Sequence, residues 1–289
     1  MDMYVGALLF PTPFLKLEYL EKYKTGIIQI PLNENSTEKI PCYFQKNPES
    51  NDILIIFHGN GSDIFNLAYY TPEISKKNNI NILIPEYPGY SIYTTLHSPE
   101  KCLENALIIY DFVLNNIKNI SEKNIYILGR SLGTSVAAFL ASQRNPAGTF
   151  LISPFTTYAS VGQHDEEYNK ILSEYFRTID YIDKIKTPIL FIHGKSDYLV
   201  KCEESLRLFE KCNKDIKKEI VLKEDMGHNF LYEFLRDEII PSIVDFAKKY
   251  CSWNNEINNG ENKNIIDFDK KFYIDDEGIK NILIYFKDN

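Results

Sequence analysis

Short, mostly apolar runs bounded by turn residues recur along the chain. They cover residues 52–58, 80–85, 125–128, 148–152, 188–193 and 219–222. Runs of this length without alternating polar positions are typical of strands that are buried on both faces of a sheet. Two earlier runs, residues 26–30 and 40–44, flank a polar, Asn-rich turn and therefore predict a hairpin.

Helical signals lie between these runs. Ser62 or Asp63 is suited to cap a helix, because apolar residues follow at helical spacing. Ser98, followed by Pro99, predicts the start of a helix that runs to about residue 118. Further helices are predicted over about residues 134–141, 203–212 and 230–249. Strands that alternate with helices predict an α/β fold, with a mainly parallel sheet and helices on both faces.

Three stretches fall outside this alternation. We predict one domain over residues 26–250, and we expect residues 1–25 to pack on its core. Within this domain, the polar stretch of about 154–186 is predicted to form a short lid insert. Residues 251–289 are predicted to form an Asn-rich linker and a C-terminal tail. The tail either docks on the core as a short helix, which we favour, or binds a partner.

Composition narrows the range of partners. The chain has 289 residues, 44% of them hydrophobic, and a formal net charge of −8. This charge argues against nucleic acid and anionic membranes as electrostatic partners. The five cysteines are odd in number and form no Cys-x-x-Cys pair, so we predict neither a disulfide framework nor a zinc site. Free thiols are typical of a cytoplasmic protein.

The apolar run at residues 5–10 is too short to span a bilayer. It also lacks the basic residues that open a signal peptide, so we predict none. The run either covers one edge of the core or makes peripheral contact with a membrane, and the sequence leaves both readings open. The sequence does not indicate an oligomeric state.

The sequence Gly129-Arg130-Ser131-Leu132-Gly133 lies between a predicted buried strand and a predicted helix. In this context a Gly-x-Ser-x-Gly pattern is a candidate nucleophile elbow. A chain that reverses within so few residues places the serine in a strained conformation and crowds the residues two positions on either side. Glycines at 129 and 133 meet that requirement. The alternative is a plain Gly-Ser turn between a strand and a helix.

A reactive serine needs a general base, and the base needs an orienting group. Open parallel sheets place functional residues at the carboxyl ends of their strands. Asp197 follows the 188–193 run by a short loop, and His228 follows the 219–222 run in the same way. The order Ser131, Asp197, His228 therefore predicts a triad in which Ser131 is the nucleophile.

Other acids and histidines fit this arrangement less well. Asp225 lies only three residues from His228, and Asp183 precedes its strand. The remaining histidines are His58, His97, His164 and His193. His58 and His193 each precede a glycine at a strand end, where local packing or hydrogen bonding is the expected role.

A tetrahedral intermediate carries a negative oxygen, which two backbone amides must stabilise. The amide of Leu132 follows the nucleophile and is one candidate. The second should come from the turn after the 52–58 run, at Asn60 or at Gly61. The alternative for this turn is purely conformational, because Gly and Asn both tolerate positive φ.

Six motifs together resemble a known family. They are His58–Gly61, Glu86–Tyr90, Gly129–Gly133, Ser153–Thr156, Thr187–Asp197 and Gly227–Asn229. With them the chain resembles an α/β-hydrolase, and more narrowly the α/β-hydrolase-domain proteins that include the eukaryotic protein depalmitoylases and are related to prolyl-oligopeptidase-like hydrolases. The resemblance implies Ser131 as nucleophile, Asp197 as acid and His228 as base.

The resemblance also implies acyl substrates held as esters or thioesters, so we expect a serine hydrolase that acts on a small acyl ester or an acylated protein through an acyl-enzyme. No metal or organic cofactor is implied. Five aromatic residues of the predicted lid either face the acyl group or pack the lid onto its own core. They are Phe155, Tyr158, Tyr168, Tyr175 and Phe176. A peptidase of the related clan and a binding or scaffold protein with little turnover remain the alternatives.

The chain departs from the family at three places. Ser91 stands where members usually have glycine, and the lipidated N-terminal cysteine cluster of the depalmitoylases has no equivalent. Residues after about 254 match no part of the family that we recognise. Membrane recruitment is therefore not implied by the resemblance.

Overall fold

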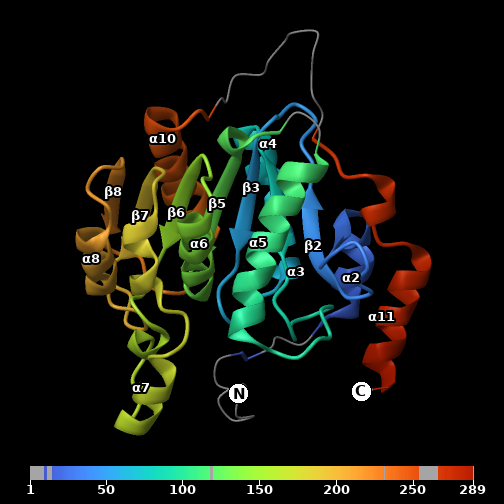
Figure 1. Ribbon diagram of the computed structural model, residues 1–289, viewed down its shortest axis with the longest axis horizontal. Helices are drawn as coiled ribbons and strands as arrows, with labels where there is room; N and C mark the ends of the chain where they lie inside the picture. Colours follow the sequence, from blue (N-terminus) through green and yellow to red (C-terminus); the bar gives the residue numbers. More distant parts are fainter. Residues whose placement is uncertain (1–9, 12–14, 118–119, 231, 254–265, 289) are drawn as a thin grey trace. The chain divides into compact units, whose positions relative to one another are not determined.

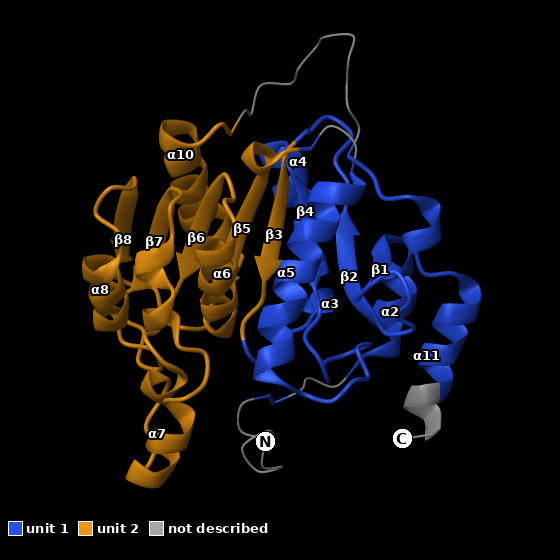
Figure 2. Cartoon of the chain, in the orientation of Figure 1, with its two compact units in different colours: residues 1–51, 60–120, 257–289 blue, residues 52–59, 121–256 orange. Residues whose placement is uncertain are grey.

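The fold is described from a computed structural model. The structure describes residues 10–11, 15–117, 120–230, 232–253 and 266–288. The chain divides into two compact units, which Figure 2 shows in different colours. Unit 1 comprises residues 1–51, 60–120 and 257–289, and unit 2 comprises residues 52–59 and 121–256. The predicted boundaries at residues 25 and 250 stay predictions, and the predicted linker at 254–264 lies outside the described residues.

Unit 2 is built on five parallel strands that pair in the order β3-β5-β6-β7-β8. Their bounds are β3 Ile53–Phe57, β5 Ile125–Arg130, β6 Gly148–Ile152, β7 Ile189–Gly194 and β8 Lys218–Lys223. All residues of β6 and β7 are buried, as their continuous apolar runs predict. Every residue of β8 is only partly buried, which agrees with its place at the end of the strand order.

Helices cover these strands. Unit 2 contains α6 (Leu132–Gln143), α7 (Glu166–Leu172), α8 (Cys202–Lys211), α9 (Tyr232–Phe234) and α10 (Ile240–Tyr250). Figure 1 shows α6 in front of β5 and β6, and α10 behind the strands. The ring of Phe246 on α10 lies edge-on to Phe150 on β6, with 6.3 Å between the ring centroids. Short 3₁₀ turns complete the unit at Glu122–Asn124, Tyr158–Ser160, Thr178–Asp180 and Ile182–Lys184.

The predicted helix over 230–249 is divided in the structure. A π-helical segment, Leu235–Ile239, separates α9 from α10. Pro241 supplies the physical reason, because it has no amide hydrogen to donate to the carbonyl four residues before it. A periodicity of apolar residues does not reveal such a break.

Unit 1 contains the antiparallel strands β1 (Ile27–Pro31), β2 (Lys39–Gln45) and β4 (Asn81–Pro85), paired in that order. The predicted hairpin is confirmed, since Ile28 pairs with Cys42. The helices are α2 (Leu17–Tyr23), α3 (Ile64–Ala68), α4 (Thr71–Asn78), α5 (Pro99–Asn116) and α11 (Asp276–Asp288), with 3₁₀ turns at Lys24–Gly26 and Lys270–Phe272.

Two predicted helix starts are confirmed in unit 1. The side chain of Asp63, rather than that of Ser62, caps α3 and accepts the amide of Asn66 at 2.7 Å. The hydroxyl of Ser98 caps α5 and accepts the amide of Lys101 at 3.1 Å. Both caps satisfy amides that the first turn of a helix leaves without an acceptor.

Both ends of the described chain pack on unit 1. Phe10 is 2% exposed, and its ring stacks on His97 with centroids 5.3 Å apart. In the tail, the ring of Phe268 lies 4.9 Å from Phe44, and Tyr273 forms a β-bridge with Ile28. The tail therefore docks as we favoured. No helix in the described part of the chain is long and apolar enough to cross a membrane.

Ser91 adopts a φ of 44°, in the left-handed region that favours glycine. The neighbouring turn residue Gly89 also has a positive φ, 81°. Ser91 therefore holds a conformation that is strained for a residue with a side chain.

Gly133 gives the largest stability effect that we predict. A Cβ atom at this position would lie 2.1 Å from the carbonyl oxygen of Phe57 on β3, inside van der Waals contact. Since this neighbour is backbone, α6 would have to move away from the sheet. We expect Gly133→Ala to lower the free energy of unfolding by about 3 kcal/mol or more, measured by urea denaturation.

Gly227→Ala is the matched control for this prediction. Its added Cβ would have Ser196 O at 3.6 Å as its nearest neighbour, an ordinary contact. We expect its midpoint to stay close to that of the wild type. Equal midpoints for Gly133→Ala and wild type would contradict the close packing of α6 on β3.

Candidate active site

The elbow has the strained geometry that its sequence predicts. Ser131 follows β5 and precedes α6, with φ 49° and ψ −118°. A Cβ at Gly129 would lie 2.3 Å from the carbonyl oxygen of Gly133, so the two glycines touch across the turn. Only glycine fits at both positions, and the crowding holds the Ser131 side chain at the carboxyl end of β5.

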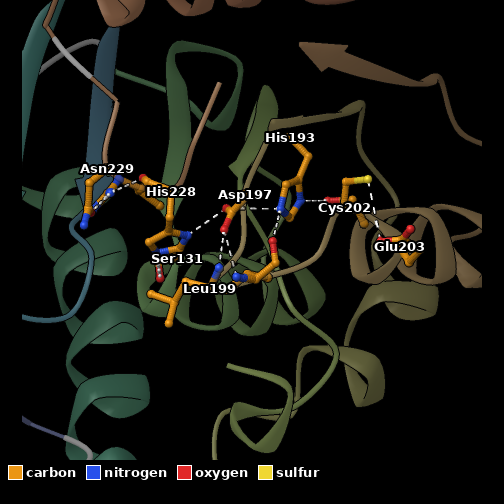
Figure 3. A network of polar contacts seen from close by, with 11 residues as sticks. Ser131, His193, Asp197, Leu199, Cys202, Glu203, His228 and Asn229 are labelled. Atoms are coloured by element: carbon orange, nitrogen blue, oxygen red, sulfur yellow. Dashed lines mark hydrogen bonds and ion pairs between the residues drawn. The ribbon is translucent and has the colours of Figure 1, made fainter. Parts of the chain in front are cut away.

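His228 lies within hydrogen-bonding distance of Ser131. Its Nε2 is 3.0 Å from Ser131 Oγ, and its Nδ1 is 2.8 Å from Asp197 Oδ2 (Figure 3). A carboxylate only accepts, so Nδ1 carries the proton, and Nε2 is then free to accept the serine proton. The structure therefore brings together the three residues that the order of strand ends predicts.

Asp197 is held by four donors. Its Oδ1 accepts the amides of Leu199 at 3.0 Å and Val200 at 2.8 Å, and its Oδ2 faces His228 and His193. Burial alone would raise the pKa of this carboxyl. Hydrogen bonds from His193, His228 and the Val200 amide outweigh burial, and the pKa lies well below its ordinary value. Asp197 is therefore a fixed negative charge behind His228.

His193 is the residue of this network that sequence reasoning missed. It is fully buried, and its Nε2 lies 2.8 Å from the carbonyl oxygen of Val200 and 3.4 Å from Asp197 Oδ2. Its Nδ1 lies 2.6 Å from Ser205 Oγ on α8. Hydrogen bonding near its own strand end was predicted, but the link to the acid was not. The spacing His193-Gly194-Lys195-Ser196-Asp197 is a signal that could have revealed it.

Comparison with known proteins places this site in a family. The sequence profile of the prolyl oligopeptidase family matches residues 96–253, more than half of the chain, and this range includes Ser131, Asp197 and His228. The chain belongs to the prolyl oligopeptidase family. It is a hydrolase with the α/β-hydrolase fold, which confirms the fold class expected from its alternating strands and helices.

Individual relatives agree with the family. An alpha/beta hydrolase of Acanthamoeba polyphaga mimivirus is 25% identical, over 82% of this chain and 91% of its own. Human alpha/beta hydrolase domain-containing protein 17B is 28% identical, over 73% of both chains. The esterase Pf2001 of Pyrococcus furiosus superposes with a TM-score of 0.64 at 19% identity, covering 83% of this chain and 95% of that one. This structural likeness concerns the fold.

The rival residues lie outside the hydrogen-bonded network of this family member. Asp225 is exposed, and Asp183 lies 3.7 Å from Lys211. His58 bonds to the carbonyl of Gly59, as expected for a strand-end histidine, and His97 bonds to that of Pro88. His164 bonds to the carbonyl of Val161.

The two candidate oxyanion donors lie in different units. Leu132 is the first residue of α6, where backbone amides have no acceptor within the helix and carry partial positive charge. Asn60 belongs to unit 1, where the hydroxyl of Tyr90 hydrogen-bonds to its side-chain oxygen. The assignment of Leu132 and of Asn60, or Gly61, as oxyanion donors stays a prediction.

The aromatic residues of the 154–186 segment divide into two groups. Phe155, Tyr158 and Phe176 are buried and contact one another, so they pack the segment onto its own core. Tyr168 on α7 is 43% exposed. The packing interpretation is confirmed for the three buried residues, and the interpretation that aromatics of this segment face the acyl group stays a prediction.

Proposed function

We propose that this hydrolase cleaves carboxylic esters or thioesters through an acyl-enzyme on Ser131. The relay of Ser131 Oγ, His228 and Asp197, with separations of 3.0 and 2.8 Å, carries the proposal. Ser131 Oγ attacks the acyl carbon while its proton passes to His228 Nε2. The negative charge on the acyl oxygen is stabilised by the amide of Leu132 and a second donor at Asn60 or Gly61.

The second half of the reaction reverses these roles. His228 delivers its proton to the leaving alcohol or thiol as the bond to the acyl carbon breaks. A water molecule then attacks the acyl-enzyme, gives its proton to His228 Nε2, and releases the acid with Ser131 restored. Asp197 stays ionised throughout and stabilises the imidazolium that forms twice.

Exposed apolar side chains near Asp197 support a lipid-like acyl group. Tyr198 is 91% exposed and Leu199 is 43% exposed. The backbone amide of Leu199 donates to Asp197, which places both residues beside the acid. The Leu199 carbonyl accepts the amide of Gly162 at 2.8 Å, and this hydrogen bond joins Leu199 to the 154–186 segment. The resemblance to depalmitoylases points in the same direction, towards an acylated protein as substrate.

A fluorophosphonate probe tests the proposal directly. We expect it to label the wild-type protein and to leave Ser131→Ala unlabelled, because the probe reacts only with an activated serine. Ser142→Ala is the matched control, because Ser142 lies on α6 and its hydroxyl donates to the carbonyl of Phe139 rather than to His228. It should label like the wild type. Failure to label the wild type would favour a binding or scaffold protein, and equal labelling of Ser131→Ala would contradict Ser131 as the nucleophile.

A peptidase is the second candidate, because the matching family is that of prolyl oligopeptidase. A panel of p-nitrophenyl esters, acyl thioesters and aminoacyl amides separates the two. We expect turnover of esters and thioesters to exceed that of amides, and activity to rise with acyl length. Turnover of aminoacyl amides with none of acyl esters would establish the peptidase.

The remaining expectations about partners and location are part of the same proposal. We propose a cytoplasmic enzyme that requires no metal or organic cofactor. Peripheral contact with a membrane would bring the enzyme to acylated proteins. The apolar residues 5–9, which lie outside the described residues, are the candidate segment for this contact. Deleting them and measuring sedimentation with vesicles would test it.

A further inference from the structure

Arg130 is an unusual residue for its position. It is the last residue of β5, where the five residues before it are buried, and it is covalently next to Ser131. Burial lowers the pKa of its guanidinium from the ordinary value, and the nearby Asp197 carboxylate opposes that shift. Arg130 itself is partly buried, and a cation that is withdrawn from water is unfavourable unless it is paired and hydrogen-bonded. Its contacts therefore deserve a functional explanation.

Those contacts converge on the loop that carries the base. Arg130 Nη2 donates to the backbone carbonyl of His228 at 2.6 Å and to Asn229 Oδ1 at 3.0 Å. The guanidinium carbon lies 5.4 Å from the ring centroid of Phe230, a cation–π distance. Three consecutive residues after β8 are thus bound by one side chain of β5.

Gly59 lies next to the guanidinium. A Cβ added at Gly59 would lie 2.7 Å from Arg130 Nη1, so a larger residue there would shift the end of the Arg130 side chain. The turn after β3, the elbow and the His228 loop, all within unit 2, meet at Arg130.

The earlier part of the same loop is tied to a different strand end. Ser196 Oγ donates to the carbonyl of Glu224 at 2.9 Å, and Met226 is packed against Gly194. These contacts fix the start of the loop relative to the Asp197 side of the site. Arg130 fixes its end relative to Ser131. Figure 3 shows His228 between Asn229 and Asp197.

We propose that Arg130 is a positioning residue that sets the distance between His228 Nε2 and Ser131 Oγ. It is bonded to the backbone of the base and covalently joined to the nucleophile, so it links the two partners of the proton transfer through a short, rigid path. Lysine is an incomplete replacement, since its ammonium group can donate to these acceptors but lacks the planar guanidinium that lies over the Phe230 ring. This inference rests on the proposed function, because it concerns the same proton transfer.

The test compares Arg130→Gln, Arg130→Lys and Asn229→Ala with the wild type on p-nitrophenyl acetate. We expect Arg130→Gln to lower kcat about 10- to 100-fold with KM nearly unchanged, as for a small misplacement of a catalytic group. Arg130→Lys should recover only part of this loss. Asn229→Ala, which removes one of the two acceptors, should lose less than Arg130→Gln.

Arg207→Gln is the matched control for the loss of a guanidinium. Its side chain is 67% exposed and pairs with Glu204 on α8. We expect its kcat to stay within about twofold of the wild type, as for a surface substitution. A wild-type kcat and KM for Arg130→Gln would overturn the inference.

Chemical rescue separates positioning from mere stability. In Arg130→Ala, millimolar guanidinium chloride should restore part of kcat, whereas equal sodium chloride should not. Guanidinium does not stabilise folded proteins, so a variant impaired only in stability would gain no activity. If the wild type does not react with a fluorophosphonate, the proposed function fails. If the wild type reacts, but guanidinium gives no rescue, only the role of Arg130 fails.

Discussion

His228→Ala is expected to lower kcat for ester hydrolysis by about 10⁴- to 10⁶-fold. The change removes the imidazole nitrogen that lies 3.0 Å from Ser131 Oγ and accepts its proton. Release of p-nitrophenol under saturating substrate measures the effect.

The matched control and a double variant sharpen this result. His164→Ala removes an imidazole that bonds to the carbonyl of Val161, and it should leave hydrolysis of a short ester close to the wild-type rate. Combining Ser131→Ala with His228→Ala should cost no more than either change alone, because the two residues act as one unit. Additive losses would argue against a shared proton transfer.

Asp197→Asn is expected to lower kcat by about 10⁴-fold with little change in the fold. The asparagine amide would donate to His228 Nδ1, which places the imidazole proton on Nε2. In that tautomer Nε2 cannot accept a proton from Ser131. Asp225→Asn is the matched control, since Asp225 lies three residues from His228 but is exposed. A loss below tenfold for Asp197→Asn would contradict the assigned acid.

The same variant has a pH signature in stability. The folded-state pKa of Asp197 is lowered relative to an unfolded value of about 3.9. Its carboxylate therefore contributes stability that is present above pH 4 and is lost as pH falls through the folded-state pKa. In urea denaturation, the advantage of the wild type over Asp197→Asn should stay constant at neutral pH and shrink below about pH 4. An advantage that grows on acidification would contradict the sign.

The sequence indicated most of the fold because buried strands leave continuous apolar runs. β5, β6 and β7 were predicted within two residues at each end for this reason. The three hydrogen-bonded residues of the candidate site were also predictable, since each follows a strand and parallel strands bring their carboxyl ends to one edge. Ser131 and His228 are 97 residues apart in sequence, yet their order along the chain was sufficient.

What the sequence did not indicate depends on the direction of single side chains. Nothing in the apolar pattern shows that Arg130 turns towards His228, or that His193 reaches Asp197 across four residues. The division of the 230–249 helix is of another kind. One missing amide hydrogen at Pro241 outweighs a regular apolar pattern, so a local chemical detail prevails over periodicity.

The separation of Ser131 from His228 and Asp197 also governs when reactivity arises as the protein folds. The hydrogen bonds of the relay join residues 97 and 31 positions apart, and the strands between them pair in parallel. Such non-local pairing closes long loops and is slow compared with helix formation. During refolding, reactivity towards a serine probe should return after the helical signal, so the probe reports completion of the sheet.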